Sequence, residues 1–111
     1  MRWKSSALAI AAIIFSTASV AADDIAIAKQ RIIRLARDPG SVSFSDVKVR
    51  DGVGPQRIRV VCGLFNARNG FGGMTGSQPF VYMVTINEFV PDGASRAELE
   101  MAKASYQNLC L

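Results

Sequence analysis

Two cysteines constrain what this 111-residue chain can fold into more than any other feature. Cys62 lies in a β-rich run, on the face that Ile58, Val60 and Leu64 share by alternation. Cys110 lies at the end of a helical segment, on its apolar stripe. Both side chains are therefore expected to point into the same interior, which predicts a disulfide between Cys62 and Cys110.

Such a disulfide would close a loop of about 49 residues and contribute roughly 4 kcal/mol on the chain-entropy model. That contribution is comparable with the whole stability expected of a small domain. Two other uses of the cysteines fit less well. A redox-active pair needs the C-x-x-C spacing, and a metal site needs more ligands than two cysteines in a chain without histidine.

The first 22 residues have the pattern of a secretory signal peptide. Arg2 and Lys4 precede an apolar block over residues 7–15, and the segment ends in small residues. A bilayer takes roughly 20 residues in a helix, so an uncleaved membrane anchor is the less favoured alternative. Cleavage after Ala22, or after Ala21, would leave one small domain, residues 23–111, in the periplasm or the medium. These are oxidising surroundings, in which paired cysteines form disulfides.

The charge of the chain argues against a nucleic-acid partner. Removal of the signal takes Arg2 and Lys4, so 11 of the 13 basic residues and all 9 acidic residues remain, a net charge of +2. Nucleic-acid binding needs a strongly basic and clustered surface. We therefore expect no nucleic-acid partner, and no membrane span once the signal is cleaved.

The periodicity predicts two amphipathic helices. Residues 24–37 carry apolar side chains at steps of three and four, and Pro39 forces the helix to end near Arg37. Near the C-terminus, Ser95 followed by Glu98 forms a capping box ahead of a helix over residues 96–110. The predicted apolar stripes consist of Ile25, Ala28, Ile32, Leu35 and Ala36 in the first helix and Leu99, Ala102, Tyr106, Leu109 and Cys110 in the second.

Three β-rich runs separate the helices. Residues 42–49 alternate with a phase slip that predicts a bulge at Asp46, and residues 57–65 and 80–89 alternate without a slip. Because no helix lies between these runs, we expect a three-stranded antiparallel meander. The predicted fold is α+β, with both helices packed on the sheet in two layers. The face with Arg57, Arg59, Val61 and Phe65 would then stay open.

The chain lacks the residues of most catalytic sites. Without histidine, it cannot form a triad with an imidazole base. Its aspartates Asp38, Asp46, Asp51 and Asp92 fall at predicted turns or strand breaks, where they are ordinary turn residues and caps. An enzyme that uses the carboxylates of Glu88, Glu98 or Glu100 stays the least favoured alternative. We expect no enzyme activity, no cofactor and no metal.

A glycine-rich segment, residues 66–79, joins the second and third runs. Its glycines match the dinucleotide-binding pattern only loosely, and no Lys-Ser or Lys-Thr follows Gly76 as a P-loop requires. Both phosphate-binding motifs also open a helix, whereas a strand is predicted here. The segment is longer than the usual hairpin loop of 2 to 5 residues. It is therefore either a binding loop with Phe71 and Met74 near its tip or a loop folded back on itself.

Two segments of the chain, "RDPGSVSFSDVKV" and "VCGLFNARNGFGGMTGSQPFVY", resemble a family of small, uncharacterised exported proteins of Gram-negative bacteria. The family pattern is a DP-x-SV-x-F segment followed by a VCG-x-x-N-x-(K/R)-N-x-(F/Y)-GG-(F/Y)-x-G-x-x-x-F segment. The resemblance covers residues 38–82, and Met74 stands where the family has an aromatic residue. It implies a periplasmic or secreted location and brings no known activity, ligand or catalytic residue.

The leading hypothesis is a non-enzymatic binding module of the bacterial envelope, whose partner is a protein or another envelope component. The alternative is an inhibitor of an extracytoplasmic hydrolase, which would insert the segment 66–79 into the cleft of its target. The predicted partner-binding residues are Asn66, Arg68, Asn69, Phe71 and Met74 of the segment and Arg57, Arg59 and Phe65 of the open face.

Overall fold

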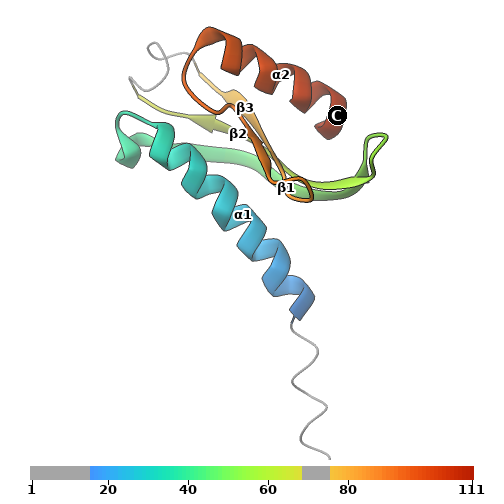
Figure 1. The fold of residues 1–111 in the computed structure, drawn as a ribbon. Coiled ribbons are helices and arrows are strands. Elements are labelled where there is room, and N and C mark those ends of the chain that lie inside the picture. The colour runs from blue at the N-terminus through green and yellow to red at the C-terminus, as the bar shows by residue number, and fades with distance from the viewer. Residues whose placement is uncertain (1–15, 69–75) are drawn as a thin grey trace, which may run out of the picture.

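The structure, a computed structural model, describes residues 16–68 and 76–111. Within these ranges the elements are α1 (Ser16–Leu35), the 3-10 helix η2 (Pro39–Ser41), β1 (Ser43–Val53), β2 (Ile58–Asn66), β3 (Gln78–Met83), β4 (Glu88–Val90) and α2 (Arg96–Cys110). The strands form one antiparallel sheet in the order β1-β2-β3-β4 (Figure 1). The predicted α+β meander is confirmed, but it has four strands and not three.

The additional strand arises because residues 80–89 form a hairpin and not one strand. The backbone N–H of Asn87 donates to the carbonyl of Val84 at 3.2 Å, and Asn87 takes a φ of 53°. Asparagine tolerates this left-handed conformation better than most residues. The turn pairs Phe89 with Tyr82 across the hairpin and leaves Ile86 42% exposed. Ile86 lies in the turn but continues the apolar alternation that begins at Phe80. The sequence pattern alone therefore did not show that the chain reverses direction here.

The two helices cover opposite faces of the sheet, so the domain has three layers and not the two predicted (Figure 1). The reason is that the middle strands are apolar on both faces. In β2, Val61 and Phe65 belong to the hydrophobic cluster under α1. The alternate residues Val60 and Cys62 belong to a second cluster under α2. Each face of the sheet thus has its own helix to exclude water.

The first helix is longer than predicted. It begins at Ser16 instead of Asp24 and ends at Leu35, two residues before the predicted end. Alanines before Asp24 are strong helix formers and continue the helix toward the N-terminus. The predicted apolar stripe is confirmed, since Ile25, Ala28, Ile32, Leu35 and Ala36 all lie in or against the first cluster.

The start of α2 is set by half of the predicted capping box. The N–H of Glu98 donates to Ser95 Oγ at 3.2 Å, as the box requires. The carboxylate of Glu98 accepts from the N–H of Asp92 at 2.7 Å instead of returning to Ser95. This contact fastens the first turn of α2 to the segment that follows β4.

The strand β1 contains the predicted bulge. Its pairing with β2 shifts between Ser45 and Lys48, and Asp46 between them has a φ of 53°. A second irregularity between Arg50 and Val53 includes Gly52, with a φ of 66°. Bulges of this kind bend an edge strand and increase its twist.

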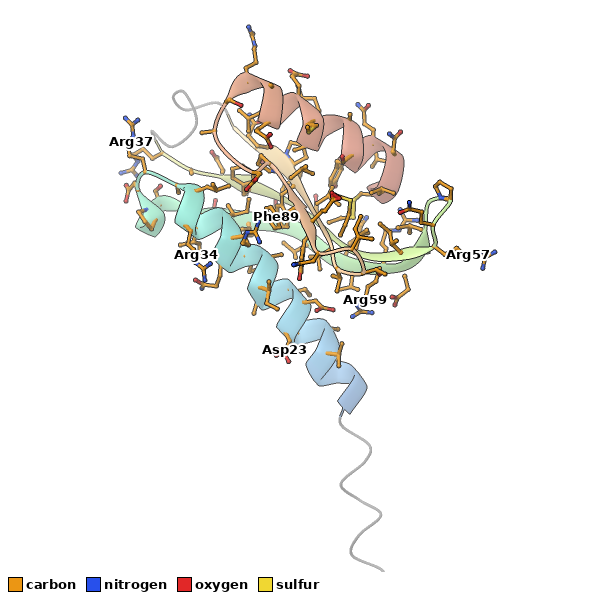
Figure 2. All side chains as sticks on the ribbon, in the orientation of Figure 1. Asp23, Arg34, Arg37, Arg57, Arg59 and Phe89 are labelled. Carbon is orange, nitrogen blue, oxygen red and sulfur yellow. A yellow bond between two sulfur atoms is a disulfide. The ribbon has the colours of Figure 1, made fainter. Side chains whose placement is uncertain are left out.

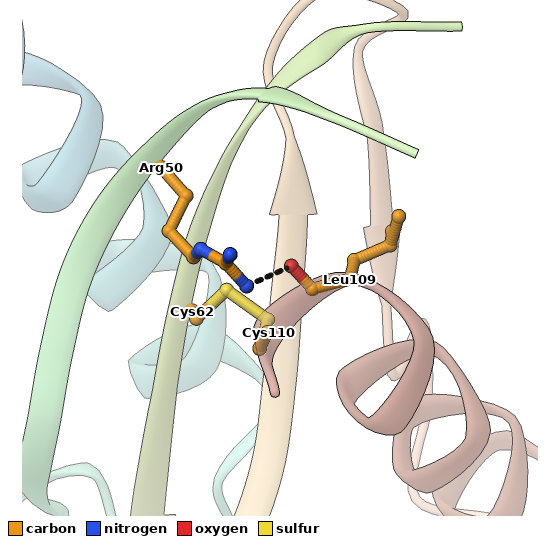
Figure 3. The surroundings of a disulfide bond; sticks show 4 residues. All are labelled: Arg50, Cys62, Leu109 and Cys110. Atoms are coloured by element: carbon orange, nitrogen blue, oxygen red, sulfur yellow. Dashed lines mark hydrogen bonds between the residues drawn. A yellow bond between two sulfur atoms is a disulfide. The ribbon is translucent and has the colours of Figure 1, made fainter. Parts of the chain in front are cut away.

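The disulfide between Cys62 and Cys110 is confirmed (Figure 3). It joins the middle of β2 to the last residue of α2, with the Cα atoms 6.0 Å apart. Beside it, Arg50 Nη1 donates to the carbonyl of Leu109 at 2.9 Å, so β1 also holds the end of α2. Both cysteines are buried, as the alternation and the helical stripe predicted.

Candidate functional site

The base of the glycine-rich segment is held at both ends. The strand β2 ends at Asn66 and β3 begins at Gln78, and the outermost pair of their ladder is Phe65 with Gln78. Ala67 is buried in the cluster under α1. The segment therefore leaves and re-enters the sheet at one place, like the loop of a hairpin.

A hydroxyl group fastens this base to the connection between α1 and β1. Ser41 Oγ accepts from the backbone N–H of Arg68 at 2.9 Å and donates to the carbonyl of Asp38 at 2.7 Å. The N–H of Ser41 also donates to the same carbonyl at 3.0 Å. Because Ser41 lies in η2, the 3-10 helix orients the point where the glycine-rich segment begins.

We call the surface formed by η2, Asn66, Arg68 and the end of α1 the loop end of the domain. Arg34, Arg37 and Arg68 are exposed here, and Asn66 is half-buried. Figure 2 shows Arg37 at this extremity of the molecule and Arg34 nearby on α1. Among residues 16–68 and 76–111, none of these three arginines forms an ion pair. The loop end therefore carries positive charge that its described neighbours do not neutralise.

A hollow of about 220 Å³ on the outer side of α1 continues the loop end. It is lined by Ala26, Ile27, Gln30, Arg31 and Arg34. Arg31 is held in place because its guanidinium lies 5.0 Å from the ring centre of Phe89 and 3.9 Å from a carboxylate oxygen of Asp92. The hollow thus has apolar lining, the guanidinium of Arg31, which contacts Phe89 and Asp92, and the guanidinium of Arg34, which has no ion pair among the described residues.

The structure separates the residues that the sequence assigned to one contact surface. Asn69, Phe71 and Met74 lie outside the described residues. Arg57 is exposed in the β1–β2 turn, at the opposite end of the molecule from Arg37 (Figure 2). The loop end and Arg57 therefore cannot belong to one compact site.

The predicted open face of the sheet is covered. Val61 is fully buried and Phe65 is 1% exposed, because α1 packs on this face. Phe65 contributes to the core beside Phe80, with ring centres 6.3 Å apart. The prediction that Phe65 is a surface residue is wrong, because α1 packs on the face of the sheet that was expected to stay open.

Arg59 is committed to contacts inside the domain. Its Nε donates to Asp24 Oδ2 at 2.7 Å, and its Nη1 donates to Asp51 Oδ2 at 2.9 Å. The hydrogen bonds, first to Asp24 and then to Asp51, raise the pKa of the guanidinium above its ordinary value. Arg59 is therefore a charged link between α1, β1 and β2, and the surface offers little of it to a partner.

Sequence reasoning missed an apolar hollow of about 140 Å³ at the end of the domain that carries Arg57. The residues that line the hollow are Val53, Gly54, Pro55, Gln56, Ile58, Met83, Ile86 and Leu109. In the sequence, its only signal was Ile86, an apolar residue in a turn. This lining contains no acid, base or nucleophile, so the hollow has no catalytic group of its own.

Four of the acidic side chains contact other groups of the chain, and two of these four, Glu98 and Glu100, belong to the carboxylates named for the enzyme alternative. Asp24 and Asp51 bind Arg59, Glu98 caps the N–H of Asp92, and Glu100 lies 3.6 Å from Lys103. The part of the chain that the structure describes has no group of three or more histidine, cysteine or acidic side chains placed to hold a metal. It also has no helix long and apolar enough to cross a membrane.

Comparison of the chain with protein-family models, with curated proteins and with solved structures gives no match.

Proposed function

We propose that this protein is a small exported interaction module of the bacterial envelope, without enzyme activity, that binds a partner through the loop end. The observation that carries the proposal is the base of the glycine-rich segment. Ser41 bonds to both Arg68 and Asp38, so the segment begins at a fixed point beside exposed arginines. Connections longer than the usual hairpin loop serve function more often than short turns do.

The charge of the loop end suggests the chemistry of the partner. Arg34, Arg37 and Arg68 have no ion pair among the described residues, and Asp38 is the exposed acid beside them. Unpaired exposed cations attract an anionic surface and speed its association. We infer that the partner is a protein or envelope component that presents negative charge to the loop end.

An alternative is that the module inhibits an extracytoplasmic hydrolase. It is supported by the way β2 and β3 hold the segment, through the pair Phe65–Gln78 and the disulfide four residues before Asn66. A loop with a rigid base loses less entropy when it enters a cleft. Inhibition at a 1:1 ratio of module to hydrolase, lost in Phe71→Ala, would favour this alternative over a simple contact module.

The test compares charge reversals at the two ends of the domain. Arg68→Glu combined with Arg37→Glu should lose capture of a periplasmic partner by the exported chain, and raised salt should weaken capture by the unchanged chain. Arg57→Glu is the matched control for Arg68→Glu alone, because each variant reverses one exposed arginine in a turn and the two turns lie at opposite ends of the domain. Circular dichroism would show that all variants fold.

Loss of capture in Arg57→Glu alone would contradict the proposal and place the contact at the opposite end. Equal capture by all variants, at low and high salt, would also contradict it. Turnover of any substrate by the purified chain, lost on changing one acid while the fold persists, would contradict the non-enzymatic assignment.

A further inference from the structure

The outward side of α1 carries exposed residues whose character changes along the helix. Ile27, Gln30 and Arg34 follow one another at steps of three and four, so they lie on one side of α1, and Arg37 follows just past its end. All four are exposed, and Ile27 is 46% exposed although it is apolar. Figure 2 shows Arg34 on the side of α1 away from the sheet and Arg37 at the extremity. We call these four residues the α1 ridge.

The positive charge of the α1 ridge is not neutralised by its described neighbours. Among residues 16–68 and 76–111, Arg34 and Arg37 form no ion pair. Arg31 adds a guanidinium beside the ridge, and its contact with Asp92 is long, at 3.9 Å. On the other face of the sheet, α2 has as many acidic as basic residues: Arg96, Lys103, Glu98 and Glu100. The excess positive charge therefore lies on the α1 side of the domain.

The shape of this surface does not suit a small, rigid ligand. The hollow beside the α1 ridge is lined by residues of α1 alone: Ala26, Ile27, Gln30, Arg31 and Arg34. Small-molecule sites are clefts or cavities that enclose most of the ligand, whereas one helix presents a convex surface. The guanidinium groups of Arg34 and Arg37 therefore face outward side by side and do not converge on one anion.

An anionic lipid surface matches both the charge and the shape. Lipid headgroups move laterally, so a separate phosphate can reach each guanidinium of a convex helix. Helices that lie in a membrane interface combine basic side chains with apolar ones that enter between the headgroups. Ile27 and Arg34 supply this combination on one side of α1. A folded protein partner would instead need carboxylates fixed at matching positions.

We propose that the α1 ridge rests on an anionic phospholipid surface, with Ile27 between the headgroups and Arg34 and Arg37 at the phosphates. The inference rests on the proposed function, because it names the anionic envelope component that the loop end meets. In this orientation Arg68 lies at the edge of the contact, since it belongs to the same end of the domain. The helix α2 faces away from the lipid, because it covers the opposite face of the sheet (Figure 1).

The first test is sedimentation of the exported chain with vesicles. The chain should bind vesicles of equal parts phosphatidylglycerol and phosphatidylcholine, and not vesicles of phosphatidylcholine alone. Arg34→Gln and Arg37→Gln should each lower the partition coefficient about fivefold, the factor that one basic side chain adds near an anionic surface. Arg57→Gln is the matched control and should bind like the unchanged chain, because its charge lies at the other end of the domain, beyond the screening length of about 8 Å.

A change of the opposite sign checks the direction of the effect. Asp38 is an exposed acid beside Arg37, and its side chain forms no cap hydrogen bond with η2. Asp38→Asn should therefore strengthen vesicle binding, because it removes a charge that headgroup phosphates repel. Equal binding to both kinds of vesicle, or equal binding by Arg34→Gln and Arg57→Gln, would overturn the proposal.

The second test uses tryptophan fluorescence to find which side of the domain meets the lipid. Trp3 is the only tryptophan of the chain, and the unchanged chain, measured in parallel, gives its contribution. The emission of Ile27→Trp should shift to shorter wavelength when phosphatidylglycerol vesicles are added, because tryptophan prefers the membrane interface. Asn108→Trp, at an exposed position of α2, is the control and should not shift. No shift in Ile27→Trp, or equal shifts in the two variants, would overturn the proposal.

The two tests separate this inference from the proposed function. A chain that binds no vesicles but captures a protein through Arg37 and Arg68 would overturn the lipid surface and leave the proposed function standing. Vesicle binding that needs Arg34 and Arg37 and shifts the emission of Ile27→Trp supports the lipid surface.

Discussion

At the residue scale, one glycine of β2 leaves the space that an aromatic ring of β3 fills. Gly63 pairs with Phe80, and a Cβ at Gly63 would lie 2.6 Å from two ring carbons of Phe80 and 3.0 Å from Val47. Phe80 cannot move away easily, because it is fully buried and its ring contacts those of Phe44, Phe65 and Phe89. The glycine is required because the aromatic ring occupies the space of a side chain.

Gly63→Ala should therefore destabilise the domain by about 1–3 kcal/mol, the usual cost of overpacking a core. Thermal unfolding followed by circular dichroism should show a fall in Tm of roughly 4–8 °C per kcal/mol. Gly40→Ala is the control, since a Cβ there would meet only Asp38 Oδ1, at 3.9 Å. Equal melting temperatures for the two variants would mean that the Phe80 ring adapts and that a glycine is not required at this position.

At the element scale, the alternation of β2 predicted which residues lie together but not what covers them. It placed Cys62 with Val60 and Ile58 on one face, and all three lie in the cluster under α2. It placed Val61 with Phe65 on the other face, which is also correct. The path of the chain between elements decides on which face of the sheet each helix packs. The alternation of apolar residues within one strand gives no information about that path.

The link between β2 and α2 leads to a prediction at the same scale. Replacing both cysteines, Cys62→Ala with Cys110→Ala, should reduce the free energy of unfolding by about 4 kcal/mol on the chain-entropy model. Denaturant unfolding of the oxidised chain and of the variant measures this loss, and reduction of the unchanged chain should give a similar one. The assignment fails if the native, unreduced chain carries two thiols that can be alkylated.

At the scale of the whole molecule, the direction of β2 explains why the predicted site was divided. Arg57 precedes this nine-residue strand and the glycine-rich segment follows it. A strand rises about 3.3 Å per residue, so its two ends lie roughly 30 Å apart. The prediction grouped Arg57 with the glycine-rich segment because of the face that β2 presents. It did not take into account that the two lie at opposite ends of this strand.

The ion pair between Asp24 of α1 and Arg59 of β2 predicts how far the start of the domain can be shortened. A chain of residues 23–111 keeps both side chains. A chain that starts at Ile25 lacks Asp24, leaves Arg59 without one partner, and should unfold at a clearly lower temperature than residues 23–111. Thermal unfolding of the two chains checks this prediction, and equal melting temperatures would contradict it.

The sequence by itself determined the features that depend on neighbouring residues: the helical stripes, the bulge at Asp46, the Ser95 cap and the shared faces that predicted the disulfide. Each follows from local backbone geometry and from a period that can be read over a few residues. Only the tertiary structure decided that the helices lie on opposite faces, that Arg59 binds Asp24 and Asp51, and that Ser41 holds the base of the glycine-rich segment. These contacts join residues distant in the chain, and their formation depends on how whole elements pack to exclude water from both faces of the sheet.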